Sequence, residues 1–372
     1  MSAAPSPAAV EPDHVAAKLS TLDRFLPVWI GLAMASGLLL GRLIPSLNDT
    51  LDAIKIGTVS LPIAIGLLAM MYPVLAKVRF GSIGAELADR RTLGLSLTMN
   101  WLIGPLLMFT LAWTFLRDLP ELRTGLIIVG LARCIAMVLI WNDLACGSRE
   151  LAAGLVAVNS VFQIVMYSVL GWFYLTVLPG WLGLDTADLH VAIWDIAKSV
   201  LVFLGIPLAA GYLTRRIFEP RKGTDWYEHR FIPRIGPVAL YGLLFTIVVL
   251  FALQGDQITN NPLDVLRVAV PLLIYFAVMW TVSFVTAYRL HIPYERNASV
   301  AFTAAGNNFE LAIAVAIGVF GVTSGQALAG TIGPLIEVPA LLALVYVSLW
   351  AKRRYYSPDP DTATIPQPIH PT

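Results

Sequence analysis

The sequence predicts an all-α integral membrane protein with ten transmembrane helices, arranged as two inverted five-helix repeats with discontinuous, crossing fourth and ninth helices. Three observations predict this fold: the composition, the spacing of the apolar segments, and the similarity between the two halves of the chain. Of the 372 residues, 57% are hydrophobic and only 13% are charged. Soluble globular proteins carry about 25% charged residues, so this composition indicates a protein of the lipid bilayer.

Ten apolar segments of about 20 residues, the length that crosses a bilayer as a helix, follow one another along the chain. They cover residues 25–44, 59–78, 93–116, 124–146, 152–178, 197–217, 235–254, 268–288, 298–320 and 327–350. The fifth can be a longer, tilted helix, because Asn159, Gln163 and Tyr167 interrupt it. Residues 1–21 are rich in Ala, Pro and Ser. They predict a flexible cytosolic arm rather than a secretory signal, which would begin with basic residues and a short apolar core.

The distribution of Lys and Arg predicts the orientation in the membrane. With both ends inside, the inner connections hold eighteen of the 25 basic residues and the outer connections six, and Arg133 lies within the membrane. An excess of basic residues marks the cytoplasmic side, so both termini are expected in the cytoplasm of a multi-pass protein of the cell membrane. The charged connection at 79–92 can form a short interfacial helix, and the Pro-rich segment 353–372 predicts a disordered cytosolic tail.

Four blocks of sequence recur in the same order at a nearly constant offset. The offset is 174 or 176 residues between Arg42 and Arg216, Gly66 and Gly242, Gly130 and Gly306, Cys134 and Glu310, and Ala153-Gly154 and Ala329-Gly330. The chain therefore divides into repeats at 22–180 and 190–352. Each repeat holds five spans, an odd number, so the second must enter the membrane upside down. Inverted repeats place the substrate site near the midplane, often on discontinuous helices.

The fourth apolar segment carries a charge in its middle. Residues 130–147 read GLARCIAMVLIWNDLACG, with Arg133 beside Cys134. A charged side chain at this depth costs about 2.5–3.5 kcal/mol on insertion scales, and such residues commonly mark transport pathways. The segment is therefore a candidate for half of a binding site.

The ninth apolar segment carries a second polar group and supplies the other half of that site. Residues 306–316 read GNNFELAIAVA and place Asn307, Asn308 and Glu310 within the span. Gly and Asn tolerate turn geometry, so the helix is expected to unwind here. Exposed backbone is permitted inside a membrane only if it lines a cavity, so a cavity is expected here.

Cys134 has two interpretations. A lone cysteine in a membrane helix is usually a small hydrophobic residue, but the neighbouring Arg133 favours the thiolate, which binds soft electrophiles. Adjacent residues on a helix point about 100° apart, so this coupling needs a break in the helix. Cys146 lies twelve residues away, about 18 Å along a helix, and is interpreted as structural.

Glu310 also has two interpretations. A buried carboxylate either forms an ion pair, here with Arg133, or carries protons or contacts substrate, as intramembrane acids commonly do. Glu337, one helix later, is a second intramembrane acid and the next candidate for proton coupling. The neighbouring amide side chains can supply hydrogen bonds to a cavity or join helices.

Several function classes are excluded. The sequence contains no phosphate-binding loop, nucleophile elbow or His-rich metal motif, and its five histidines lie in the tails and connections. Neither cysteine has the neighbours of a zinc site or a disulfide framework. A net charge of +1 leaves no basic face for nucleic acid. We therefore expect a transporter without a cofactor or resident metal, with the bilayer as its surroundings.

Four segments together resemble the arsenite efflux carriers of arsenical resistance, in the bile-acid/arsenite/riboflavin transporter superfamily. They are IGLLAMMYPVLAKVRF, GLARCIAMVLIWNDLACG, AFTAAGNNFELAIAVAIGVFG and GPLIEVPALLALVYVSLW, and the likeness covers residues 22–352. It implies the ten-span inverted-repeat fold and export of trivalent arsenic, in some members antimony, driven by the proton gradient. The functional cysteine and glutamate of that family correspond to Cys134 and Glu310.

The residues and the resemblance lead to one hypothesis for the site. A single thiol with amide and carboxylate partners can bind and release arsenite, a soft trihydroxide, whereas several thiolates would hold it too firmly for turnover. The expected substrate contacts are Cys134, Asn307, Asn308 and Glu310, with proton exchange at Glu310 and then Glu337, and electrostatic tuning by Arg133. Oligomeric state does not follow from the sequence.

Two alternatives remain at this point. A sodium-coupled organic-anion carrier of the bile-acid type could use Glu337, Gln163 and Asn307 as ion ligands, but Arg133 and Cys134 would then have no role. A membrane receptor would need effector regions in its tails, which are short and contain no binding motif.

Overall fold

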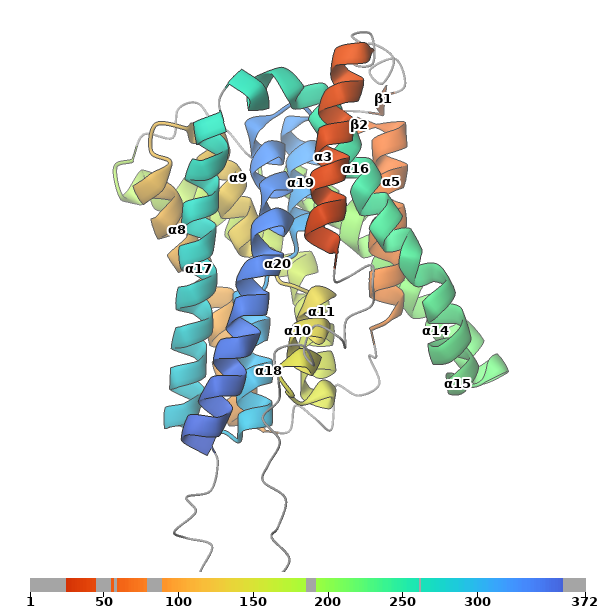
Figure 1. Cartoon of the computed structure of the whole chain (residues 1–372), viewed down its shortest axis with the longest axis vertical. Coiled ribbons are helices and arrows are strands. Elements are labelled where there is room, and N and C mark those ends of the chain that lie inside the picture. Colours follow the sequence, from red (N-terminus) through yellow and green to blue (C-terminus); the bar gives the residue numbers. More distant parts are fainter. Residues whose placement is uncertain are drawn as a thin grey trace, which may run out of the picture.

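The computed structural model describes residues 25–44, 55–56, 59–78, 89–184, 192–260 and 262–356. Within these ranges the chain is almost entirely helical (Figure 1). Two short antiparallel strands, β1 (Lys55–Ile56) and β2 (Val59–Ser60), directly precede the second helix. The predicted arm 1–21, most of the predicted interfacial helix and residues beyond 356 lie outside the described ranges.

The described residues of the first half form eight α-helices. They are α3 (Leu26–Leu43), α5 (Leu61–Ala76), α7 (Arg90–Thr98), α8 (Gly104–Phe115), α9 (Pro120–Leu131), α10 (Met137–Leu144), α11 (Arg149–Trp172) and α12 (Leu178–Trp181). The π-helical turns η2 (Met99–Ile103) and η3 (Phe173–Val177) join α7 to α8 and α11 to α12 without a break. Longer helices result at the third and fifth predicted segments.

The second half continues with eight more described α-helices. They are α13 (Ile193–Val200), α14 (Ile206–Lys222), α15 (Thr224–Trp226), α16 (Ile232–Asn260), α17 (Pro262–Arg289), α18 (Tyr294–Ala305), α19 (Phe309–Phe320) and α20 (Gly325–Ala351). The π-helical turns η4 (Leu201–Gly205), η5 (Tyr227–Phe231) and η6 (Lys352–Tyr356) extend α13, α15 and α20.

Each predicted apolar segment coincides with a helix or with two consecutive helices. Among the described residues, six helices are long and apolar enough to cross a membrane. One of them, Arg149–Trp181, shows that the fifth segment forms the longer of the two helices considered. The segments 25–44 and 59–78 give shorter apolar helices. One expectation is wrong: the predicted disordered tail begins too early, because residues 353–356 continue α20 as η6.

Four helices, α3, α5, α14 and α16, pack on one another and form what we call the panel (Figure 1). Small residues permit this packing, because a Cβ at Gly41 would lie 3.1 Å from the Cα of Ala252, and a Cβ at Gly242 would lie 2.9 Å from the carbonyl oxygen of Gly66. Helix α16 therefore contacts both α3 and α5 backbone to backbone.

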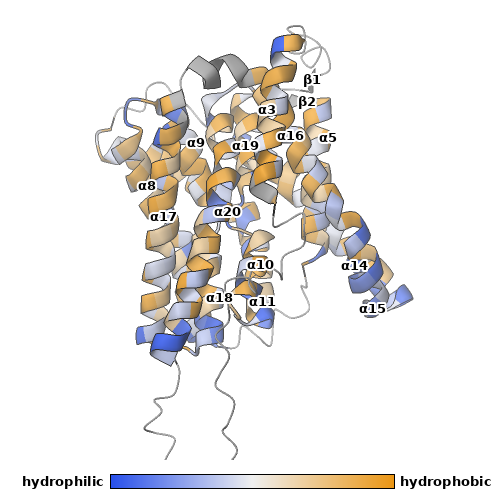
Figure 2. Ribbon diagram, in the orientation of Figure 1, coloured by the Kyte–Doolittle hydropathy of each residue, from blue (hydrophilic) through white to orange (hydrophobic). Residues whose placement is uncertain are grey.

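The remaining long helices form a second body, which we call the core bundle. It contains α8, α9, α11, α17, α18, α19 and α20, which pack around a continuous apolar interior. The panel contacts it where α3 meets α20 and where α5 meets α19. Most residues of both bodies are hydrophobic, and hydrophilic residues gather toward the ends of the helices, as on α14 and α15 (Figure 2). The polar segments of the sequence lie inside the core bundle.

Candidate functional site

Two interrupted helices meet in the core bundle. Helix α9 ends at Leu131 and α10 begins at Met137, while α18 ends at Ala305 and α19 begins at Phe309. The backbone segments between them, 132–136 and 306–308, run antiparallel and form what we call the crossing. An isolated bridge pairs Arg133 with Asn307.

Backbone hydrogen bonds hold the crossing together. The N–H of Cys134 donates to the carbonyl of Gly306 at 3.3 Å, and the N–H of Asn308 donates to the carbonyl of Ala132 at 3.0 Å. The N–H and C=O groups of unwound backbone need hydrogen-bond partners within the protein, because the hydrocarbon core of a bilayer offers no water to bond them. The two polar motifs of the sequence are thus in direct contact.

Arg133 is fully buried at the crossing. Its Nη1 donates to the hydroxyl of Tyr275 at 2.9 Å, its Nη2 donates to the carbonyl of Gly130, and its backbone N–H donates to Oε1 of Gln163 at 2.8 Å. No carboxylate of the described residues forms an ion pair with it. The alternative of a structural pair between Arg133 and Glu310 is therefore wrong in this conformation.

The side chains of the two asparagines form hydrogen bonds with backbone groups at the crossing. Asn307 donates from Nδ2 to the carbonyls of Val129 at 2.9 Å and Ala132 at 3.2 Å. Asn308 accepts the N–H of Leu311 at 3.0 Å and so caps α19. Each amide keeps one buried atom without a hydrogen-bond partner, Oδ1 of Asn307 and Nδ2 of Asn308. Half of each side chain thus stays available to a ligand.

The two cysteines lie in different surroundings. Cys134 is 3% exposed, and a Cβ at Gly306 would lie 3.0 Å from its own Cβ. Cys146 is exposed, in a left-handed conformation with φ 57° after α10. Cys146 thus lies apart from the crossing that holds Cys134.

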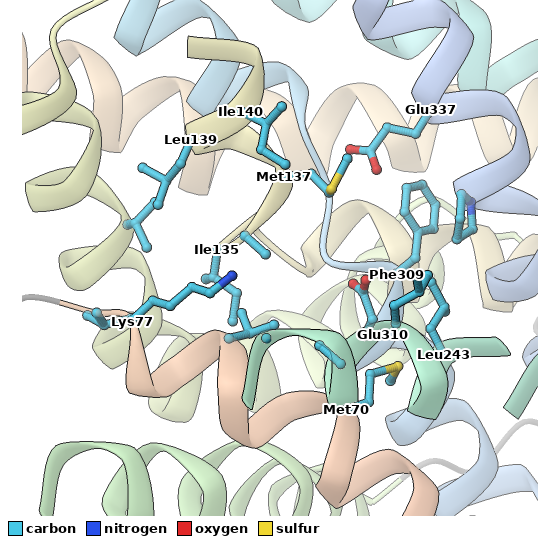
Figure 3. A pocket seen from close by; sticks show the side chains of 18 of the residues that line it. Met70, Lys77, Ile135, Met137, Leu139, Ile140, Leu243, Phe309, Glu310 and Glu337 are labelled. Carbon is cyan, nitrogen blue, oxygen red and sulfur yellow. The ribbon is translucent and has the colours of Figure 1, made fainter. Parts of the chain in front are cut away.

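A cavity of about 330 Å³ lies between the panel and the core bundle. Glu310 and Glu337 contribute its carboxylates from the core bundle, and Lys77 at the end of α5 extends into it from the panel (Figure 3). Its walls are otherwise largely apolar and include Met70, Val74, Ile135, Met137, Leu240, Leu243, Phe309 and Pro334.

Part of the wall of the cavity is formed by residues of the crossing and the first residue of α10. Ile135, Ala136 and Met137 line the cavity, whereas Cys134 itself does not. The N–H of Asn307 donates to Oε1 of Glu337 at 3.3 Å, which ties one cavity carboxylate to the crossing. Cys134 therefore lies one residue behind the surface that a ligand in this cavity would contact.

The charged groups of the cavity lie on opposite sides of it. Its two carboxylates form no ion pair with any described residue, and Lys77 lies across from them. No group of three or more metal-ligating side chains occurs among the described residues. Buried acids without a cation partner commonly belong to proton and substrate pathways.

Sequence reasoning missed Lys77 and Tyr275. Lys77 was counted only as a basic residue near the membrane surface, although its place at the end of an apolar segment could have suggested the mouth of a cavity. Tyr275 gave no signal, because a tyrosine within an apolar segment is usually packing. The helix caps Ser148 and Ser324 were also missed, although they are separated by the repeat offset of 176.

Comparisons with known proteins agree with the resemblance in the sequence. Residues 64–261 match the sodium bile acid symporter family. The arsenical-resistance protein Acr3 of Corynebacterium glutamicum is 58% identical over 92% of this chain and 93% of its own length. Acr3 of Alkaliphilus metalliredigens is 31% identical over 93% of this chain and 97% of its own, and an uncharacterized transporter of Synechocystis is 37% identical over 94% of both.

The extent of these matches covers both halves of the chain and the whole crossing. A sequence with several long apolar helices that matches transporters along nearly its full length is a multi-pass membrane transporter and not an enzyme. The chain therefore belongs to the sodium bile acid symporter family, as a close relative of the Acr3 arsenical-resistance proteins.

Proposed function

We propose that this transporter exports arsenite from the cytoplasm by alternating access, coupled to the proton gradient. The observation that carries the proposal is the cavity between two separate helix bodies, with Glu310 and Glu337 in its wall beside the crossing that holds Cys134. The names of the Acr3 relatives support arsenic as the substrate.

In this proposal the chain crosses the cell membrane ten times as two inverted repeats, 22–180 and 190–352, with both termini in the cytoplasm. Equivalent residues of the two halves meet in the interior, which supports a two-fold relationship: Gly66 contacts Gly242, and Ala132 bonds Asn308. The arm 1–21 and the tail 353–372 then lie in the cytoplasm.

Arsenite is a neutral trihydroxide around a soft arsenic atom, and the site offers a partner for each part. The Cys134 sulfur would contact arsenic, since soft thiol ligands suit soft centres. The unpartnered Oδ1 of Asn307 and Nδ2 of Asn308 would bond hydroxyl groups. Access to the sulfur from the cavity requires the cavity-lining residues Ile135–Met137 to shift, which ties substrate capture to movement of α10.

Glu310 and Glu337 would exchange protons for arsenite. Both carboxylates line the cavity, so protons and substrate compete for one space. Binding must be strong enough for entry and weak enough for release, and one thiol meets this condition. Arg133 stays in the core bundle and provides a fixed positive charge to the site.

Transport into everted vesicles tests the proposal. We expect Cys134→Ser to lose most arsenite uptake, while the matched variant Cys146→Ser transports normally, because Cys146 lies outside the site. Undiminished uptake by Cys134→Ser would remove the thiol from the mechanism. Antimonite, a larger soft trihydroxide, is expected to compete with arsenite.

Proton coupling is tested by measuring how arsenite uptake responds to a pH gradient. In vesicles with an imposed pH gradient, Glu310→Gln is expected to abolish the response of arsenite uptake to the gradient, and Glu337→Gln to reduce it. If Glu310→Gln still moves protons with arsenite, Glu337 carries the coupling role. A gradient response retained by the double variant would refute proton exchange at these two carboxylates.

A second candidate function is sodium-coupled uptake of an organic anion. The family match and the largely apolar walls of the cavity favour it. Replacing external sodium with choline separates the two functions, because only the symporter would stop.

A further inference from the structure

The carbonyl end of α9 is where a coupling cation would bind. The last carbonyl groups of a helix have no partner within the helix and carry partial negative charge. In transporters with discontinuous helices, such ends and the unwound backbone beside them coordinate sodium ions or protons. The family to which the chain belongs is named for sodium symport, so this end implies a sodium site.

The residues present do not fit a sodium ion, because the oxygens it would need already accept hydrogen bonds. The carbonyl of Ile128 accepts the Tyr167 hydroxyl at 2.9 Å. The carbonyls of Val129 and Ala132 accept Nδ2 of Asn307. The carbonyl of Gly130 accepts Nη2 of Arg133. A sodium ion would have to displace these donors.

Arg133 itself supplies the positive charge at this position. Its guanidinium is bound by two neutral oxygens, the Gly130 carbonyl and the Tyr275 hydroxyl, and by no carboxylate of the described chain. The fit is close: a Cβ at Gly104 would lie 2.8 Å from Nη1 and 3.0 Å from the Tyr275 hydroxyl. A bound sodium ion would also be surrounded by neutral oxygens. Here the cation that these oxygens surround is the guanidinium group of Arg133.

We infer that Arg133 is a tethered cation that takes the place of a coupling sodium ion at the crossing, so that transport needs no sodium. The inference rests on the proposed function and specifies its ion coupling. A tethered charge stays with the carrier through the whole cycle and cannot be released. Any ion exchanged for substrate must then bind elsewhere, which leaves the cavity acids Glu310 and Glu337.

The test measures stability, which does not depend on arsenite transport. Purified wild type and Arg133→Ala are melted in detergent with sodium, guanidinium or choline chloride at equal millimolar concentration. We expect the wild type to respond equally to all three. For Arg133→Ala, guanidinium or sodium should raise the melting temperature by about 2 °C or more over choline, because a cation that binds only the folded state stabilises it.

Arg123→Ala is the matched control. Arg123 is also buried, donates to the carbonyl of Arg117 and lies over the ring of Trp113, but it is away from the crossing. Its alanine variant should lose stability without any preference among the cations. If Arg133→Ala cannot be purified, Arg133→Gln enters the same assay with the same expectation, since its amide can still reach neighbouring oxygens.

Two results would overturn the inference. One is a wild-type melting temperature or arsenite flux that falls when choline replaces sodium. The other is an Arg133 variant that responds alike to sodium, guanidinium and choline. A wild type that melts at the same temperature in all three salts but does not transport arsenite would contradict the proposed function. That result would not contradict the role of Arg133 as a tethered cation.

Discussion

The backbone N–H of Asn308 donates a 3.0 Å hydrogen bond to the carbonyl of Ala132, and these two residues are 176 positions apart in the chain. That separation is the offset at which blocks of sequence recur. In the proposed two-repeat arrangement Ala132 and Asn308 are equivalent positions. Their hydrogen bond therefore makes the crossing the place at which the two halves of the chain contact each other directly.

The neighbouring asparagines should respond differently to the same substitution. In Asn307→Ser the serine side chain is too short to reach the carbonyls of Val129 and Ala132. A buried carbonyl left without a hydrogen bond costs about 1–3 kcal/mol of stability. Asn308→Ser keeps a side-chain oxygen for the α19 cap, and serine caps helices about as well as asparagine. We expect thermal melting to rank Asn308→Ser near wild type and Asn307→Ser clearly below it. The reverse order would show that the cap, not the carbonyl bonds, holds the crossing.

Close packing within the panel predicts a strong effect of one added methyl group. A Cβ at Gly41 would meet the backbone of Ala252, which cannot move without separating α3 from α16. We expect Gly41→Ala to cost about 1–3 kcal/mol, as overpacking does. Gly31→Ala on the same helix meets nothing within 4 Å and should be neutral or slightly stabilising. Melting curves of the two variants make the comparison, and equal stability would contradict the packing described for α3.

The two thiols should react with a maleimide at very different rates. Cys146 is exposed and Cys134 is buried, and reaction requires an accessible thiolate. We expect one fast-labelled thiol per chain, lost in Cys146→Ser and kept in Cys134→Ser, with the second appearing only after denaturation. Fast labelling of Cys134 in the native protein would mean that residues 135–137 open the wall of the cavity at rest.

An ion pair outside the membrane predicts a pH dependence. Arg267 on α17 hydrogen-bonds Asp118 in the connection after α8 and lowers the pKa of that carboxyl to about 2. A carboxyl with a lowered folded-state pKa stabilises the fold above its unfolded pKa, and this contribution is lost as the pH falls from about 4 to about 2. Asp118→Asn should therefore melt below wild type at pH 6 and match it near pH 2. In an Arg267→Gln background the substitution should have no such effect.

The fold was largely predictable because the bilayer imposes its own length scale. Apolar segments of about 20 residues located the helices, and Gly306-Asn307-Asn308 located one break from backbone propensity alone. The division into panel and core bundle was not predictable. It depends on which helix faces match in shape, such as Gly41 against Ala252, and a single sequence does not report such pairs.

The residues of the candidate site could be proposed from the sequence, whereas their contacts could not. Depth in the membrane identified Arg133, Glu310 and Glu337, because buried charge is costly wherever it lies. The partners were not predictable: Arg133 bonds Tyr275 rather than a carboxylate. Distant side chains such as Lys77 enter a cavity only through tertiary packing, which no local pattern records.

The volume of the cavity has a pharmacological consequence. At about 330 Å³ the cavity falls within the range of pockets that accommodate drug-sized molecules. Under the proposed function, arsenite would fill only part of this volume, so selection of it would depend on the chemistry of the side chains at the crossing and not on the shape of the cavity. An apolar amine of moderate size would fit the volume of the cavity and place its charge opposite Glu310 and Glu337, so under the proposed function it would compete with arsenite for this space.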